Sequence, residues 1–174
     1  MKAFIRDTLV TIILAIVIFL VVQNTAQVSI VIGSSMEPDL HDGQRLIVNK
    51  VAYYFGKPQR GDIVVFRLPT NPNSIPFIKR VIGLPGETIE IKAGVVYING
   101  SPLNEPYIKE AANYTIPKEK IPAGSYFVLG DNRNNTSDSH IWGTVPRENV
   151  MGKATLSIWP PGRWGAAPNH GFAD

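Results

Sequence analysis

Two serines, two acids and a proline crowd into residues 33–40 (GSSMEPDL) of this 174-residue chain. Such a composition is typical of a tight, exposed turn. The small residues Gly33, Ser34 and Ser35 would let a second backbone approach closely, as a peptide substrate must. An ordinary linker turn explains the same letters equally well. Ser35 is therefore a candidate nucleophile, but it needs a partner, because serine is a weak nucleophile at its own pKa.

Lys79 is the candidate base. It lies in the apolar segment 77–82 (FIKRVI), where strand alternation places Phe77, Lys79 and Val81 on one face. A lysine in this position either extends to the edge of the sheet or is buried. Burial would lower the lysine pKa from about 10.4, by several units when desolvation is complete. A buried Lys79 would be neutral near pH 7 and able to accept the proton of the Ser35 hydroxyl.

The densest polar stretch is 130–143 (GDNRNNTSDSHIWG). It is either a solvated loop held by Asx turns or a rigid support for the base, and it lacks the spacing of a calcium-binding EF-hand. In the second interpretation Thr136 or Ser137 hydrogen-bonds the base. Asp131, Arg133 and Asp138 then form ion pairs that hold the loop.

His140 offers a different mechanism, a Ser/His/Asp triad of Ser35, His140 and Asp138 or Asp131. The Ile-Trp pair that follows His140 favours packing against an aromatic ring instead. The other two histidines, His41 and His170, fall in a turn and in the tail. The sequence thus predicts no metal site and no cofactor.

Composition narrows the class of protein further. The chain has no cysteine, which excludes disulfides and a cysteine nucleophile. A net charge of +3 without a Lys/Arg cluster predicts no nucleic-acid partner. Fourteen prolines and fifteen glycines point to a turn-rich, mainly β chain.

Residues 8–22 are apolar around the whole circumference of a helix and follow Lys2 and Arg6. A cleaved signal peptide, an uncleaved anchor and a buried core helix compete for this segment. We expect the anchor, because residues 22–27 (VQNTAQ) offer no small-x-small cleavage site. The positive charges predict a cytoplasmic N-terminus, with the rest of the chain outside. The expected division is an anchor at 1–26 and a β domain at 27–174, with a hairpin-rich insertion at 87–126.

Short runs with alternating or β-branched residues predict the strands of this domain, at 27–32, 45–50, 63–66, 77–82, 88–92, 95–98, 126–129 and 154–159. The turn residues 93–94 predict a hairpin between the fifth and sixth of these. Residues 101–122, rich in proline, are expected to be irregular, and the tail from Pro160 to be loosely ordered.

Four segments together resemble the ordered sequence boxes of type I signal peptidases (serine–lysine peptidase family S26). They are 35–40 (SMEPDL), 60–66 (RGDIVVF), 79–86 (KRVIGLPG) and 130–143. The resemblance runs from the N-terminal anchor to about Pro160. It implies an antiparallel, barrel-like catalytic domain of the signal-peptidase/LexA-like fold behind a single transmembrane helix.

The resemblance also implies a function. A serine endopeptidase in the plasma (inner) membrane would remove signal peptides from exported preproteins after small residues (Ala-x-Ala), through an acyl-enzyme and without metal or cofactor. Its partners would be preprotein signal peptides and the lipid bilayer, near the export translocon. Ser35 would be the nucleophile, with its backbone N–H in the oxyanion hole, and Lys79 the base.

Further residues receive roles only from this resemblance. Those expected around the oxyanion hole and the base are Gly33, Ser34, Thr136, Asp131, Arg133 and Asp138. Those expected to line the pockets for substrate residues −1 and −3 are Val31, Met36, Leu40, Phe77 and Ile78.

Three positions depart from the family's common pattern: Asp39 stands where threonine is frequent, His140 where arginine is usual, and Gly33 where some members carry serine. Contact between His140 and Asp138 is therefore expected to depend on pH. Two other functions fit part of the pattern. One is a self-cleaving repressor-like peptidase of the same serine–lysine clan, against which the anchor argues. The other is a membrane-tethered β domain that binds extended peptides by strand addition.

Overall fold

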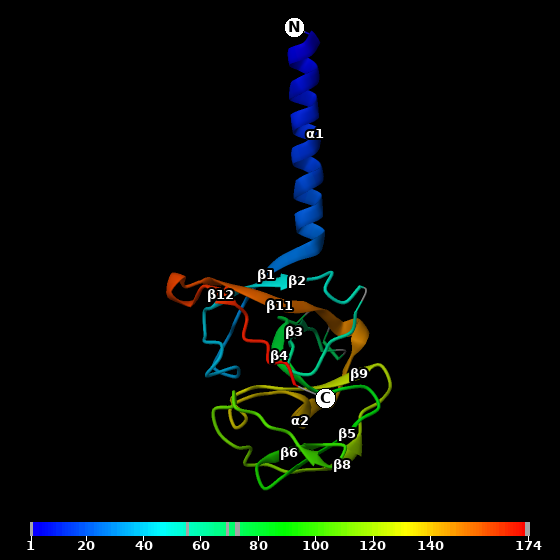
Figure 1. The fold of residues 1–174 in the computed structure, drawn as a ribbon, viewed down its shortest axis with the longest axis vertical. Helices are drawn as coiled ribbons and strands as arrows, with labels where there is room; N and C mark the ends of the chain where they lie inside the picture. The colour runs from blue at the N-terminus through cyan, green and yellow to red at the C-terminus, as the bar shows by residue number, and fades with distance from the viewer. Residues whose placement is uncertain (1, 55, 69, 72–73, 173–174) are drawn as a thin grey trace.

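The computed structural model describes residues 2–54, 56–68, 70–71 and 74–172. One long helix, α1 (Lys2–Thr25), stands away from a β body (Figure 1). Its segment Phe4–Thr25 has a mean hydropathy of 2.5 and is not buried inside the protein. At 1.5 Å per residue these 22 residues span roughly 33 Å, enough for the hydrocarbon layer of a bilayer. By length and composition the helix can cross a membrane.

A curled antiparallel sheet forms the part of the β body nearest the helix (Figure 1). Its strands, in spatial order, are β1 (Ala26–Ile30), β2 (Arg45–Asn49), β11 (Val150–Trp159), β3 (Ile63–Phe66), β4 (Phe77–Gly83), β9 (Ser125–Leu129) and β10 (Val145–Pro146), with β12 (Gly165–Ala166) paired to β11. Short helical segments lie between the later strands in the chain: α2 (Ser139–Trp142), η1 (Arg147–Asn149) and η2 (Pro161–Arg163). The expected mainly β fold behind one apolar helix is confirmed.

A smaller sheet lies at the end of the body farthest from the helix (Figure 1). Its spatial order is β7 (Ser101–Pro102), β6 (Val95–Ile98), β5 (Thr88–Lys92) and β8 (Ile116–Lys120). The predicted hairpin is present, and its turn residues Ala93 and Gly94 have positive φ angles of 49° and 78°.

The expectation that residues 101–122 are irregular is wrong for β7 and β8. Strand β8 contains Pro117, which argued against a strand because proline cannot donate a ladder hydrogen bond. In the fold β8 lies at the edge of the smaller sheet and pairs with β5 through Ile91↔Ile116, Ile89↔Glu119 and Thr88↔Lys120. An edge strand tolerates proline, since one side of its backbone needs no partner.

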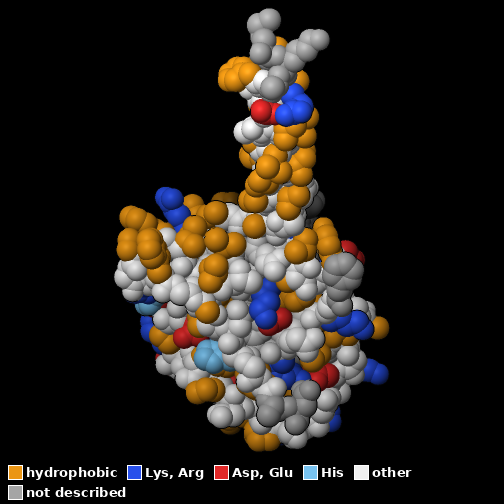
Figure 2. Space-filling model, turned by 45° about the horizontal axis from the view of Figure 1, so that its top comes forward, with side chains coloured by type: hydrophobic (Ala, Val, Ile, Leu, Met, Phe, Trp, Pro, Cys, Tyr) orange, Lys and Arg blue, Asp and Glu red, His pale blue; other side chains and the backbone are white. Residues whose placement is uncertain are grey.

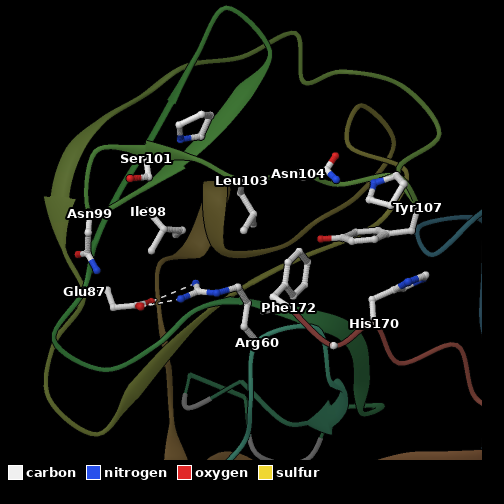
Figure 3. Close-up of a pocket in the computed structure, with 13 residues that line it drawn as sticks. Arg60, Glu87, Ile98, Asn99, Ser101, Leu103, Asn104, Tyr107, His170 and Phe172 are labelled. Atoms are coloured by element: carbon white, nitrogen blue, oxygen red, sulfur yellow. Dashed lines mark hydrogen bonds and ion pairs between the residues drawn. The ribbon is translucent and has the colours of Figure 1, made fainter. Parts of the chain in front are cut away.

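The C-terminal tail is also more ordered than its composition suggested. Asn169 accepts a hydrogen bond from the backbone of Ile63 at 2.7 Å and donates to the carbonyl of Ala154 at 3.0 Å. His170 stacks on Tyr107 with ring centroids 4.7 Å apart, and Phe172 packs edge-on against Tyr107 (Figure 3). A polar side chain that satisfies buried backbone groups of the sheet holds the tail in place.

Candidate active site

The structure brings Ser35 and Lys79 together, although 44 residues separate them. The Nζ atom of Lys79 donates a hydrogen bond to the Ser35 hydroxyl at 2.7 Å and to the carbonyl oxygen of Ile78 at 3.0 Å. The Lys79 side chain is buried, with only 4% of its surface exposed. The sequence left open whether Lys79 extends to the edge of the sheet or is buried, and in the structure it is buried.

Strand β4 fixes the position of Lys79. Lys79 pairs with Val64 of β3 on one side, whereas pairing with β9 begins only at Arg80. Among the described residues, the main chain of Phe77–Lys79 therefore has no strand partner on the edge away from β3. Burial lowers the pKa of Lys79 from 10.5 to about 8, while the negative charges of Asp138 and Asp131 act in the opposite direction. A substantial fraction of such a lysine is neutral slightly above pH 7.

Residues 33–40, here called the nucleophile turn, are held by buried side chains of the turn itself and by backbone hydrogen bonds. Met36 and Leu40 are almost fully buried beneath it, and the amide of Leu40 donates to the carbonyl of Met36 at 2.8 Å. Gly33 has φ of +77°, a conformation that favours glycine over serine. Its N–H donates to the carboxylate of Asp42 at 2.6 Å.

The polar segment 130–138 clamps this turn from the other side. The backbone N–H of Asn132 donates to the carbonyl of Ser35, and its side-chain amide donates to the carbonyl of Ser34, both at 3.1 Å. The amide of Asn135 donates to the Ser34 hydroxyl at 2.9 Å. Sequence reasoning missed both asparagines, because nothing in the sequence indicates which turn, about a hundred residues away, their amides would meet.

Gly130 explains how the two segments come so close. A Cβ atom there would lie 2.4 Å from the Thr136 hydroxyl and 2.5 Å from the carbonyl oxygen of Ser35. That hydroxyl is buried and has no hydrogen-bond partner among the described residues. Thr136 and Lys79 line the same hollow, and no hydrogen bond joins them.

Buried ion pairs hold the polar segment, but their partners come from elsewhere in the chain. The guanidinium of Arg80 binds Asp131 through two bonds of 2.9 and 2.6 Å, and that of Arg133 binds Glu105 at 2.8 and 2.5 Å. Asp138 accepts from the backbone of Gly130 at 2.8 Å. The sequence did not indicate Arg80 and Glu105 as the partners of Asp131 and Arg133.

His140 lies in a structural contact. Its Nδ1 atom is 2.6 Å from the Asp138 carboxylate, and its ring stacks on Tyr114 with centroids 4.1 Å apart. The hydrogen bond to the Ser35 hydroxyl comes from Lys79 instead. The packing on an aromatic ring agrees with the interpretation preferred over a triad.

The remaining histidines each meet one carboxylate. His41 lies 3.8 Å from Glu37, and His170 lies 3.0 Å from Asp39, which also binds Arg80 at 2.9 Å. Within the described part of the chain, no group of three or more His, Asp or Glu side chains could hold a metal ion.

Two hollows meet at Ser35 and Lys79. The first, of about 210 Å³, is mostly apolar and lies between the end of β1 and the start of β4. Its lining includes four of the five predicted substrate-binding residues: Val31, Met36, Phe77 and Ile78. The fifth, Leu40, is fully buried and supports the turn from beneath. The second hollow, of about 600 Å³, is open and is lined mainly by hydroxyl and amide groups.

Comparison with known proteins gives the class. The family described as "Signal peptidase, peptidase S26" matches residues 4–159. Probable signal peptidase I-1 of Synechocystis sp. is 43% identical over 97% of this chain and 90% of its own length. Signal peptidase I of Leptolyngbya laminosa is 48% identical over 89% of this chain and 80% of its own length.

A solved structure agrees with these sequence matches. The crystal structure of a signal peptidase I from Enterococcus faecalis is 38% identical, with a TM-score of 0.50, and the match covers 57% of this chain and 97% of that one. The chain therefore belongs to the signal peptidase family, peptidase S26, whose type I members are serine endopeptidases.

Proposed function

We propose that the protein removes signal peptides from exported preproteins, with Ser35 as nucleophile and Lys79 as general base. The observation that carries this proposal is the 2.7 Å hydrogen bond between a buried lysine amine and the Ser35 hydroxyl. A nucleophile and a base within hydrogen-bond reach, with the base tuned by burial, are what an activated serine requires.

The proposed reaction has two steps. Neutral Lys79 takes the hydroxyl proton while Ser35 Oγ attacks the carbonyl carbon of the scissile bond, and the backbone N–H of Ser35 stabilises the oxyanion. Protonated Lys79 then gives the proton to the leaving amine, which leaves an acyl-enzyme. Water, activated by Lys79, releases the signal peptide and restores the serine.

The rest of the proposed site supports this pair. The buried Thr136 hydroxyl, which has no hydrogen-bond partner among the described residues, orients the Lys79 amine. Gly33 and Ser34 shape the oxyanion hole, and the ion pairs of Asp131 and Arg133, with the Asp138 contacts, keep the polar segment rigid.

The small apolar hollow explains the proposed preference for small residues. An extended substrate adds along the unpaired edge of Phe77–Lys79, and its alternate side chains, at −1 and −3, point to the same face. That face meets Val31, Met36 and Ile78, in a space of only about 210 Å³. Because both side chains share this space, a pair of alanines fits there more readily than a pair with one large side chain.

In this proposal, the lipid bilayer surrounds helix α1 and contacts the part of the sheet beside it. Hydrophobic side chains run along α1 and over the β body around its base (Figure 2). The exposed apolar residues here include Val28 and Ile30 of β1, Leu156 and Trp159 of β11, and Trp164 between η2 and β12. Exposed apolar patches of this kind mark contact surfaces, here with lipid.

The proposed topology rests on the positive charges of Lys2 and Arg6 before the apolar segment. Residues 1–26 anchor the protein in a bacterial plasma membrane with the N-terminus in the cytoplasm. Residues 27–174 work on the outer side, near the export translocon, and the small sheet forms the 87–126 insertion.

The test is cleavage of a preprotein with an Ala-x-Ala site by the full chain in detergent micelles. We expect product cut after the second alanine, lost in Ser35→Ala and Lys79→Ala and retained in His140→Ala. Replacing the −1 or −3 alanine by phenylalanine should abolish cleavage. Activity that survives Ser35→Ala would refute the proposed nucleophile, and loss with a folded His140→Ala would favour the triad. No cleavage by folded wild type would leave a peptide-binding domain as the better account.

A further inference from the structure

The two hollows that share Ser35 and Lys79 differ in chemistry, and this difference assigns a direction to the substrate. In the proposed function the acyl side of the scissile bond lies in the apolar hollow, beside Val31 and Met36. The amine side must then leave across Ser35, toward the open polar hollow. Lys79 borders both hollows, as befits a base that takes a proton from the serine and returns it to the leaving amine.

The polar hollow holds one pair of side chains suited to binding a peptide. The Asn135 side chain is exposed, and its Nδ2 atom donates to the Ser34 hydroxyl at 2.9 Å. This bond fixes the amide group. Within the described residues, the Asn135 Oδ1 atom accepts no hydrogen bond, so it remains open to an N–H group from outside the chain.

The neighbouring side chains of this hollow do not offer the same opportunity. Asn134 uses both ends of its amide on the backbone, accepting from Asn113 at 2.8 Å and donating to Ala111 at 3.0 Å. The hydroxyl of Thr136 is buried. Asn135 is therefore the amide in the hollow with an acceptor to spare.

We propose that Asn135, held by Ser34, binds the main chain of the first residues of the mature protein, the segment that follows the scissile bond. Asn135 Oδ1 accepts a main-chain N–H there. The hollow is open and most of its lining residues carry hydroxyl or amide groups, so it can accept an extended peptide backbone with many different side chains. This inference rests on the proposed function, and it adds a binding site on the leaving-group side.

The test compares two substrates with the same signal-peptide residues up to −1. One continues with five residues of a mature protein, and the other ends in a 4-nitroanilide that offers no peptide beyond the scissile bond. We expect Asn135→Ala to lower kcat/KM about fivefold for the extended substrate, the effect of one hydrogen bond. Its kcat/KM for the anilide should fall by a clearly smaller factor, since that substrate offers no main chain to Asn135.

Matched variants separate binding from structural support. Ser34→Ala frees the Asn135 amide and also alters a residue beside the oxyanion hole, so it should weaken the extended substrate by a larger factor than the anilide. Asn134→Ala removes backbone contacts at 111 and 113 and should affect both substrates to the same degree. Preference at −1 and −3 should be unchanged in every variant.

Two outcomes would overturn the inference: an equal loss for both substrates in Asn135→Ala and Ser34→Ala, or no loss for either. Neither outcome bears on the proposed function, which would fail separately if Ser35→Ala cleaved the extended substrate. If Asn135→Ala does not fold, Ser34→Ala measured on the same two substrates decides the question.

Discussion

Replacing Lys79 by methionine should stabilise the protein at neutral pH while it abolishes activity. Methionine has a similar length and carries no charge. Burial lowers the Lys79 pKa from 10.5 to about 8, which corresponds to a cost of about 3 kcal/mol for keeping the ammonium in the fold below pH 8. The substitution removes this cost but also removes the bonds to Ser35 and Ile78, at about 1 kcal/mol each. The net gain at pH 7 is therefore about 1 kcal/mol.

The sign of the effect changes with pH. Between pH 8 and 10.5 the unfolded wild type binds the proton and the folded wild type does not, so the wild-type free energy of unfolding rises with pH. Above about pH 10.5 the cost has gone, and the methionine variant should be the less stable protein by about 2 kcal/mol, the value of the two lost hydrogen bonds.

Urea unfolding in micelles, followed by tryptophan fluorescence at several pH values, measures this difference. Other titrating groups are common to both proteins and cancel. A methionine variant that is less stable than wild type at pH 7, or a difference that does not change with pH, would refute the reasoning that Lys79 is held near neutrality by burial.

Three further substitutions probe the supports of the site. Arg133→Met leaves the buried Glu105 carboxylate without its bidentate partner and should lower the free energy of unfolding in urea by about 3–5 kcal/mol. The double variant Arg133→Met/Glu105→Leu should recover most of this loss. No recovery would show that the ion pair does not account for the loss. Gly130→Ala places a Cβ atom 2.5 Å from the carbonyl oxygen of Ser35 and should lower kcat more than tenfold in a folded protein. An unchanged kcat would mean that the nucleophile turn and the polar segment are not tightly apposed. Asn169→Ala should lower the free energy of unfolding by about 1–3 kcal/mol, because the amide of Ile63 and the carbonyl of Ala154 lose their partner, and a neutral result would indicate a tail that is loose in solution.

Local sequence signals were sufficient for most of the fold. The uniform apolarity of 8–22 predicts α1, and the β-branched runs around Ala93 and Gly94 predict the hairpin of β5 and β6, because period and turn chemistry are local properties. Strand β8 and the tail escaped prediction for the opposite reason. Whether Pro117 lies at a sheet edge, or Asn169 finds an unpaired backbone amide, depends on neighbours far along the chain.

In the candidate site, too, local sequence signals predicted some features and contacts between distant residues decided the others. Residue types marked Ser35 and Lys79 as a possible pair, since a serine needs a base and a lysine among apolar neighbours can supply one. Their contact became visible only when β4 and the nucleophile turn were placed together. The partners Arg80, Glu105 and Asn135 were missed, because ion pairs and side-chain amides leave no spacing signal when they join distant segments.

The central claim is that Lys79, and not a histidine, is the base for Ser35. It is tested most directly by the pH dependence of kcat/KM for preprotein cleavage, which reports the ionisation of the free enzyme's essential base. The account predicts a single rise in activity with a midpoint at about pH 8, since burial holds the Lys79 pKa at that value, and the same profile in His140→Ala. A profile already complete by pH 7, the behaviour of an ordinary histidine base, and altered by His140→Ala, would contradict it.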